Sequence, residues 1–437
     1  MNSVAAEVAV VVPRARPFRM LVYGLNFWPE LTGVGKFTGE MCRWLSDRGH
    51  HIEVVTAPPY YPAWEVTPEY DAFRYAGQTW AGVGDIRITR CPTWVPRRVN
   101  TWRRLVHLAS FAASSFPALV LAMRRRPDVL FVVAPTLFVA PMALVLARLM
   151  RVPIWLHVQD FEVGAMFGLS LTGSHGFARR FAFRTESLLF RAFDRVSSIS
   201  SQMVCKLHDK GIPPARCVLF PNWVDLSAVY PMEGDNALRI SLGVQPHDVL
   251  VLYSGNMGEK QGLETLIDAA RILQTDSRIK FVLAGDGAAR QRLQAVAAGM
   301  RNVVWCELQP VERLNEVLNA ADIHVLPQRA DAADLVMPSK LTGMFASGRA
   351  TVGTAQSGTQ LGIALESAGQ RVPPENAPAL AQAIIELANN PGERARLGHA
   401  GRRYAEEHFG QQVIMRRFES ELGFCVQASA TLGNPRS

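Results

Sequence analysis

The chain has 437 residues, of which 49% are apolar and 19% are charged. This length and composition suit two or three globular domains and exclude a disordered or coiled-coil protein. Six widely spread cysteines without a Cys-x-x-Cys motif argue against a disulfide framework or a zinc site and favour a reducing cytosol. The net charge of +8 is uneven, with +10 over residues 1–230 and −2 over 231–437, so we expect the first half to meet an anionic partner.

Short apolar runs alternate with longer helical patterns through the first half of the chain. Residues 1–18 carry no signal-peptide pattern, and we expect them to be flexible. Continuous apolar strands that alternate with helices predict a parallel sheet covered on both faces, here an acceptor-binding domain over 19–228. The predicted strands are 19–25, 51–56, 85–89, 128–133, 153–158, 196–200 and 217–220, and the predicted helices are 34–48, 102–125, 137–150 and 176–193.

The same alternation restarts after a polar, proline-containing stretch at 222–235. It predicts a second α/β domain over 229–410, followed by a segment 411–437 with a helix returning to the first domain and a flexible tail. The expected fold is therefore two Rossmann-like, doubly wound parallel-sheet domains facing a central cleft. The predicted strands are 249–254, 279–284, 303–306, 323–326 and 351–354, and the predicted helices are 263–273, 288–298, 311–319, 339–346, 379–388 and 411–422.

In open α/β sheets, ligands bind beyond the carboxyl ends of the strands, so the residues that follow each strand matter most. After the first strand, Gly33 and Gly35 open a helix, where backbone N–H groups can hold a phosphate or form an ordinary turn. Thr38 stands where a dinucleotide fingerprint needs its third glycine, which counts against an NAD enzyme. His157 comes at the end of a later strand. It is either a residue that lines the cleft or a buried histidine whose hydrogen bonds are made within the protein.

Glycines and lysines follow the strands of the second domain as well. Gly255, Asn256 and Lys260 come after its first strand, and Gly285, Asp286 and Gly287 follow the next one. The segment Asp334 to Lys340 then enters a helix that Pro338 and Ser339 are suited to begin. A lysine in a first helical turn is unfavourable beside the helix dipole, so Lys340 indicates a bound anion, the alternative being a lysine that extends into solvent.

The stretch 97–126 combines seven arginines and no acid with an apolar run of 19 residues. Its length is borderline for a membrane span, and His107, Ser110, Ser114, Ser115 and Pro117 interrupt it. We expect an amphipathic or partly buried helix at an anionic membrane surface, with a buried helix covering the sheet as the alternative. Nucleic acid is not expected as a partner, because no aromatic stacking platform accompanies the arginines.

Several motifs together resemble the GT-B glycosyltransferases of family 4, and within them the colanic-acid-type exopolysaccharide enzymes. They are YGLNFWPELTGVGKFTGEM, TAPPYYPAW, LHVQDFEVGAM, FPNWVD, YSGNMGEKQGLE and MPSKLTGMFASG, and the resemblance covers roughly residues 19–420. It implies that His157 contacts the donor sugar, that Lys260 and Lys340 bind its diphosphate, and that Gly33 and Gly35 close on the phosphates. Two glutamates common in the family are replaced by Leu335 and Gly343, and Asn256 stands where an arginine is frequent.

The resemblance implies a retaining hexosyltransferase that moves a sugar from a nucleotide-sugar, with a GDP-sugar as one candidate, to a polyprenyl-diphosphate-linked saccharide in exopolysaccharide biosynthesis. The nucleotide-sugar is the substrate, and no separate cofactor is expected. The absence of an Asp-x-Asp motif favours a metal-independent reaction. We expect a peripheral protein on the cytoplasmic face of the inner membrane. A sugar-nucleotide epimerase on the same fold and a non-catalytic sugar-nucleotide-binding subunit are the alternative functions.

Overall fold

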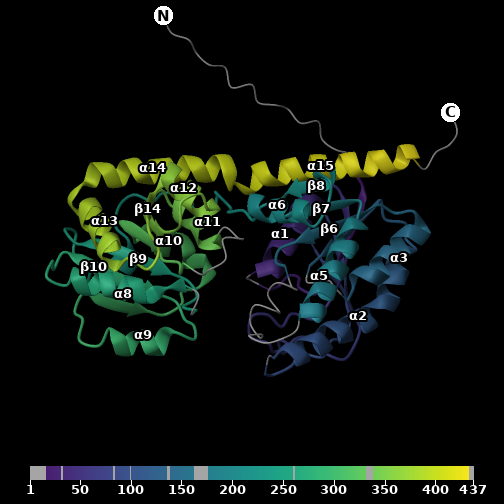
Figure 1. Ribbon diagram of the computed structural model, residues 1–437, viewed down its shortest axis with the longest axis horizontal. Helices are drawn as coiled ribbons and strands as arrows, with labels where there is room; N and C mark the ends of the chain where they lie inside the picture. Colours follow the sequence, from purple (N-terminus) through teal and green to yellow (C-terminus); the bar gives the residue numbers. More distant parts are fainter. Residues whose placement is uncertain are drawn as a thin grey trace, which may run out of the picture. The chain divides into compact units, whose positions relative to one another are not determined.

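The computed structural model describes residues 16–30, 33–81, 84–98, 100–134, 138–161, 176–258, 261–330 and 338–432. The chain divides into two compact units (Figure 1). Unit 1 comprises residues 1–199, 203–220 and 415–437, and unit 2 comprises 200–202 and 221–414. Each unit is built on one mainly parallel sheet, as the alternation of apolar strands and helices predicts.

Unit 1 contains an eight-stranded sheet in the order β3-β4-β2-β1-β5-β6-β7-β8. All neighbouring strands are parallel except the edge pair β3 and β4. The strands are β1 (Arg19–Tyr23), β2 (His51–Thr56), β3 (Ala76–Trp80), β4 (Ile86–Arg90), β5 (Val129–Val133), β6 (Ile154–Val158), β7 (Arg195–Ser198) and β8 (Cys217–Leu219). The helices are α1 (Gly33–Asp47), α2 (Thr101–Met123), α3 (Ala140–Met150), α5 (Gly176–Arg191), α6 (Ser201–Asp209) and α15 (Gln411–Leu432), and a 3-10 turn, η1, covers Pro214–Arg216.

Helices α2 and α15 cover opposite faces of the first sheet. On one face, the Tyr23 hydroxyl is 2.6 Å from Ser115 Oγ of α2. On the other, Phe418 of α15 packs against Phe131, with ring centroids 5.5 Å apart. Tyr23 pairs in register with Val132, the neighbour of Phe131, and successive residues of a strand point to opposite faces.

Buried contacts fix α15 onto unit 1. Phe418 stacks on Phe220 with ring centroids 3.8 Å apart. The next residue, Glu419, is buried and accepts hydrogen bonds from Arg48 Nε at 2.8 and 2.9 Å. Its Oε1 is also 2.9 Å from Nε2 of His50. The last helix of the chain is therefore a component of the unit that contains its first strands.

Unit 2 contains a six-stranded parallel sheet in the order β11-β10-β9-β12-β13-β14. This order reverses direction between β9 and β12, which is the switch point of a Rossmann-like sheet. The strands are β9 (Val249–Ser254), β10 (Ile279–Ala284), β11 (Val303–Cys306), β12 (Ile323–Leu326), β13 (Ala350–Thr354) and β14 (Gln370–Val372). The helices are α7 (Ala237–Ser241), α8 (Leu263–Ile272), α9 (Arg290–Val296), α10 (Leu314–Asn319), α11 (Ser339–Ala346), α12 (Gln360–Ala368), α13 (Ala377–Asn389) and α14 (Pro391–His408), with a 3-10 turn, η3, at Val311–Arg313.

The alternation of side chains along β9 divides the core of unit 2 between the two faces of its sheet. Val251 and Tyr253 pack with residues of α8, α9 and α13 on one face. Leu250 and Leu252 pack with residues of α7 and α10 on the other. The carboxyl end of β9 is therefore held rigidly between two packed layers, where the following loop begins.

Candidate functional site

Glycine loops follow β9 and β10 and pack backbone against backbone. The amide of Gly255 donates to the carbonyl of Ala284 at 2.9 Å. Gly285 has a φ of +139°, and a Cβ placed there would lie 2.1 Å from the carbonyl oxygen of Gly255. Gly287 has a φ of +153°, and its Cβ would lie 2.6 Å from the Met257 carbonyl oxygen. Only glycine fits these positions, so the loops present backbone rather than side chains at the switch point.

Lys340 lies against these loops from the first turn of α11. Its Nζ donates to the Tyr253 hydroxyl of β9 and to the carbonyl of Asn256 at 3.1 Å. A Cβ on Gly255 would lie 2.5 Å from the Cε of Lys340, so the glycine makes room for the lysine. Burial lowers the pKa of Lys340 to about 8. Within the described ranges no carboxylate pairs with this ammonium group, so the cation is available for an anionic ligand.

The remaining residues predicted for this edge lie in the same two loops or directly before Lys340 in the chain. Asn256 Oδ1 would lie 2.6 Å from a Cβ on Gly287, and Asp286 Oδ1 accepts a hydrogen bond from the Gly287 amide at 2.8 Å. Pro338 and Ser339 directly precede Lys340 at the start of α11, and no side chain caps that end. The structure thus brings together these predicted residues: Gly255, Asn256, Gly285, Asp286, Gly287, Pro338, Ser339 and Lys340. Lys260, Asp334 and Leu335 lie outside the described residues, while Gly343 lies in α11 and packs toward Leu318.

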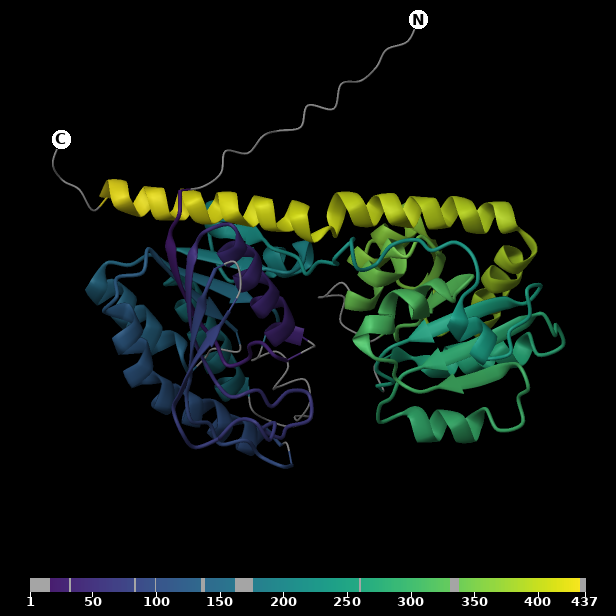
Figure 2. The same cartoon turned by 180° about the vertical axis from the view of Figure 1, so that it is seen from behind.

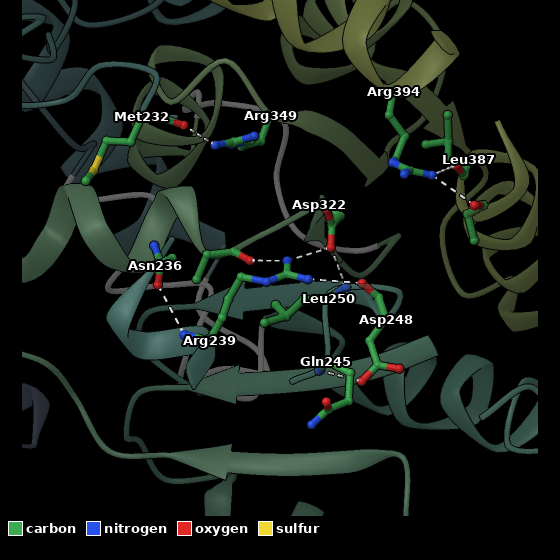
Figure 3. Close-up of polar contacts among 12 residues, drawn as sticks. Met232, Asn236, Arg239, Gln245, Asp248, Leu250, Asp322, Arg349, Leu387 and Arg394 are labelled. Carbon is green, nitrogen blue, oxygen red and sulfur yellow. Dashed lines mark hydrogen bonds and ion pairs between the residues drawn. The ribbon is translucent and has the colours of Figure 1, made fainter. Parts of the chain in front are cut away.

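The opposite, amino-terminal edge of the same sheet contains a different kind of polar cluster (Figure 3). Arg239 of α7 donates to the carboxylate of Asp322 at 2.6 Å and to the carbonyl of Asp248 at 3.0 Å. Asp322 in turn accepts the amide of Leu250 at 2.8 Å. Each of these contacts provides a hydrogen-bond partner for a charged or backbone group at the start of β9 or β12. This edge is therefore held by mutually paired charges, whereas the carboxyl edge presents a cation, Lys340, that has no carboxylate partner among the described residues.

At the carboxyl edge of the first sheet, the two predicted glycines have different surroundings. Gly33 begins α1 with a φ of +61°, and its Cβ position is 3.6 Å from the ring of Tyr61. A Cβ on Gly35 would lie 2.4 Å from a carboxylate oxygen of Glu30. Glu30 is buried, and it accepts the amides of Tyr60 and Tyr61 at 3.2 and 3.1 Å. Gly35 therefore makes room for a buried carboxylate that joins two loops, a reason that the sequence alone does not reveal.

His157 lies within β6 rather than beyond its end, and it is only 3% exposed. Its Nδ1 is 2.9 Å from Ser197 Oγ, and its ring packs against Phe131 and Phe220. Burial lowers the pKa of His157 to about 3, so the ring is neutral. These are the surroundings of a hydrogen-bonded core histidine, the second of the two interpretations that the sequence left open. The contact between His157 and a donor sugar stays a prediction.

A cavity of about 210 Å³ lies at the switch point of the first sheet, beyond the carboxyl ends of β1, β5 and β6. Its walls include polar and aromatic residues that the sequence analysis did not assign to a site. They are Asn26, Tyr60, Tyr61, Trp64, Arg104, His107 and Asp160. The sequence does contain one indication of this cavity. In the motif PPYYPAW, shortly after β2, several aromatic residues gather beyond a strand end.

Comparisons with known proteins agree with this architecture. A model of the glycosyl transferase 4-like domain matches residues 32–223, and a model of the glycosyl transferases group 1 matches residues 248–390. The chain is 39% identical over 413 residues to the colanic acid biosynthesis glycosyl transferase WcaI of Escherichia coli (strain K12), covering 92% of this chain and 99% of that protein.

Solved structures share the fold at low sequence identity. Sucrose-phosphate synthase from Thermosynechococcus elongatus matches with a TM-score of 0.73 and 17% identity, over 94% of this chain and 100% of that one. HepE from Anabaena in complex with UDP-glucose matches with a TM-score of 0.64 and 14% identity, over 93% and 100%. Together with the two matching domain models, these likenesses show that the chain belongs to the GT-B glycosyltransferases, with a glycosyl transferase 4-like domain followed by a group 1 domain.

Proposed function

We propose that this glycosyltransferase moves a sugar, with retention of configuration, from a nucleotide-sugar bound to unit 2 onto a lipid-diphosphate-linked saccharide in exopolysaccharide assembly. The observation that carries the proposal is Lys340, a largely buried cation without an acidic partner among the described residues, lying against the glycine loops after β9 and β10. Two comparisons support it: WcaI is named for colanic acid biosynthesis, and HepE was solved with UDP-glucose.

The residues at this edge suit the departure of a nucleoside diphosphate. Cleavage of a sugar–diphosphate bond builds negative charge on the leaving oxygen. A fixed ammonium group and backbone N–H groups stabilise such charge without reorganising, an effect worth several kcal/mol in a site shielded from water. Lys340 supplies the cation, and the loops at Gly255 and Gly285 let the backbone approach the phosphates. The acceptor hydroxyl then loses its proton to the departing phosphate, and no protein nucleophile is required.

The membrane part of the proposal rests on the outward face of α2. This helix is long and apolar enough to cross a membrane, and 44% of its most apolar window is buried within the protein. Its exposed residues include Trp102, at 72% exposure, with Val106, Phe116 and Leu121. Helix α3, which lies beside α2 (Figures 1 and 2), exposes Val145 and Leu149. Because α2 also packs on β1 and β2, we propose that it lies on the bilayer and does not cross it.

Arginines flank this apolar face at both ends of α2. Arg97, Arg98 and Arg103 lie at its start, where Asn100 caps the helix by accepting the Arg103 amide at 2.8 Å, and Arg124 lies at its end. All four are exposed. An apolar helix face between cationic ends fits an anionic lipid surface, because the side chains can enter the interface while the arginines meet the headgroups. On the cytoplasmic face of the membrane, this would bring the enzyme to a lipid-linked acceptor.

The test is a panel of nucleotide-sugars given to the purified protein, with and without a lipid-diphosphate-linked sugar. We expect release of nucleoside diphosphate from one donor, dependent on the acceptor and retained in EDTA. Conversion of the sugar-nucleotide without an acceptor would instead establish an epimerase. Tight donor binding without any turnover would establish a binding subunit. Activity that EDTA abolishes and added metal restores would contradict the proposed role of Lys340 as the principal charge at the diphosphate.

A further inference from the structure

The cavity at the switch point of unit 1 contains a buried polar atom that is left without a partner. His107, on the inward face of α2, is 1% exposed and lines the cavity. Its Nδ1 is 2.6 Å from the carbonyl oxygen of Trp94. Its Nε2 is buried and makes no hydrogen bond within the described part of the chain. A buried nitrogen in this state is costly unless a ligand completes it.

The contact with Trp94 determines which ring nitrogen of His107 carries the proton. A carbonyl oxygen only accepts hydrogen bonds, so Nδ1 carries the ring proton and Nε2 carries the lone pair. Burial holds the pKa of His107 below its ordinary value, and the nearby Arg104 charge lowers it as well, so the ring is neutral at pH 7. Nε2 therefore accepts a hydrogen bond and offers none. It suits a ligand hydroxyl and disfavours a phosphate oxygen.

Two aromatic rings pack against the His107 ring. The rings of Tyr60 and Trp64 lie 4.8 and 5.5 Å from the His107 ring, both in edge-on geometry, and 5.4 Å from each other. Trp64 adopts a φ of +55°, which a bulky residue rarely takes, and such positions concentrate at ligand sites. Half-exposed Tyr61 adds a further ring at the cavity wall. Flat rings of this kind pack against the apolar C–H faces of a sugar.

Two charged residues complete the cavity. Arg104 lies one helical turn before His107, and exposed Asp160 follows β6. A carboxylate accepts hydrogen bonds from sugar hydroxyls, and a guanidinium group binds a diphosphate. A ligand with hydroxyl groups, an apolar face and a nearby diphosphate would match the polar, aromatic and cationic residues of this cavity together.

We propose that this cavity holds the terminal sugar of the acceptor and that His107 is a positioning residue, whose Nε2 accepts a hydrogen bond from a sugar hydroxyl. The assignment rests on the proposed function for the identity of the acceptor. It goes beyond that function by naming the part of the acceptor that is recognised, the sugar rather than the lipid, and the residue that orients it.

Two substitutions separate positioning from a structural role. His107→Asn places an amide N–H near Nδ1, which keeps the bond to Trp94 but removes the acceptor at Nε2. His107→Gln places its amide near Nε2 and restores an acceptor there. His324→Asn is the matched control, because His324 is a fully buried histidine of unit 2 whose Nε2 is 3.1 Å from Ser347 Oγ and whose Nδ1 makes no hydrogen bond of normal geometry among the described residues.

The probes are synthetic phenoxyalkyl diphosphates carrying glucose, galactose, fucose or N-acetylglucosamine, and the same lipid diphosphate without a sugar. Binding is measured on the full-length protein by saturation-transfer NMR and titration. We expect one sugar-bearing probe to bind with saturation of its ring protons. His107→Asn should weaken that binding at least tenfold, His107→Gln should stay within threefold of wild type, and His324→Asn should leave it unchanged.

Three results would overturn the assignment: equal losses for His107→Asn and His107→Gln, equal binding of the sugar-free diphosphate, or no binding by any of the four sugars. Donor affinity, measured in parallel, should be unchanged in every His107 variant. A wild-type protein that binds a sugar probe but no nucleotide-sugar would sink the proposed function and leave the saccharide site standing.

Discussion

The carboxyl edges of the two sheets occupy equivalent places in similar folds, yet they offer opposite chemistry. In unit 2 the edge consists of backbone and one cation: Gly255 makes room for Lys340, and Gly285 makes room for the backbone of Gly255. In unit 1 it consists of aromatic side chains around His107, whose Nε2 makes no hydrogen bond within the described part of the chain. An anion needs donors and positive charge, whereas a neutral sugar needs acceptors and flat apolar walls. The difference fits the proposed assignment of an anionic donor to unit 2 and of a saccharide to unit 1.

The largest expected effect on this comparison comes from a side chain at Gly285. In Gly285→Ala, the new Cβ would lie 2.1 Å from the Gly255 carbonyl oxygen at a φ of +139°. The two loops must separate, so we expect at least a hundredfold loss of donor affinity by calorimetry and unchanged saccharide binding by unit 1. Gly299→Ala is the control, since Gly299 also has a positive φ but its Cβ would meet no atom within 4 Å. Equal losses in both variants would mean that strain alone, and not the loop contact, matters.

Membrane attachment should depend on unit 1 alone. Replacement of Arg97, Arg98 and Arg103 by Gln removes three exposed charges at about 1 kcal/mol each, so we expect roughly a hundredfold weaker binding to anionic vesicles at low salt. Arg104 is left intact because it lines the cavity that we propose to hold the acceptor sugar.

Vesicle co-sedimentation at low and high salt measures this effect, and high salt should weaken wild-type binding in the same direction. The control replaces three exposed arginines of unit 2 by Gln: Arg271, Arg301 and Arg403. Wild-type protein that never sediments with anionic lipid would refute the membrane proposal.

Lys340→Ala tests the cation directly. A charge-assisted contact to a diphosphate is worth about 1.5–3 kcal/mol, so donor affinity should fall roughly ten- to a hundredfold. Lys280→Ala is the matched control, because Lys280 is a half-buried lysine in β10 of the same sheet. If both variants stay within twofold of wild type, the donor site lies elsewhere.

The smallest expected effect is on pH dependence. Burial lowers the pKa of Lys340 to about 8, so the ammonium group loses its proton as the pH rises through that value. The donor diphosphate stays ionised throughout, and donor affinity should therefore fall about threefold between pH 7.5 and 8.5. Lys340→Ala should show a flat profile over this range. A slope that persists in the variant would assign the titration to another group.

Much of this architecture can be predicted from the sequence, because apolar strands and helices alternate clearly. Several elements were not predicted, namely β3, β14, α6, α7, α12 and α14. Strand β3 reads AGQTW, is partly exposed and pairs antiparallel with β4, so it lacks the apolar run that marks a buried parallel strand. Helix α14 is strongly charged and lacks a clear apolar stripe, and it was not predicted either.

The two parts of the candidate site differ in the same way. The glycines and Lys340 stand beside strand ends, where sequence order alone indicates a ligand. His107 sits in the interior of a long apolar helix, and only packing reveals that it faces a cavity. His157 and Trp155 lie on the same face of β6, which α15 covers. Phe418 of α15 contacts Trp155 from more than 250 positions away, so nothing in the local sequence indicates this burial.

The position of α15 has a consequence for how the protein is made. Unit 2 is nearly continuous in sequence, from residue 221 to 414, so its chain is all available before the last residues leave the ribosome. Unit 1 begins synthesis first but needs Phe418 to cover Phe131 and Trp155, and Glu419 to meet Arg48 and His50. The part of its sheet that α15 covers, at Phe131 and Trp155, therefore stays open through the translation of the whole second unit. The first half of this protein to be translated is the last to be finished.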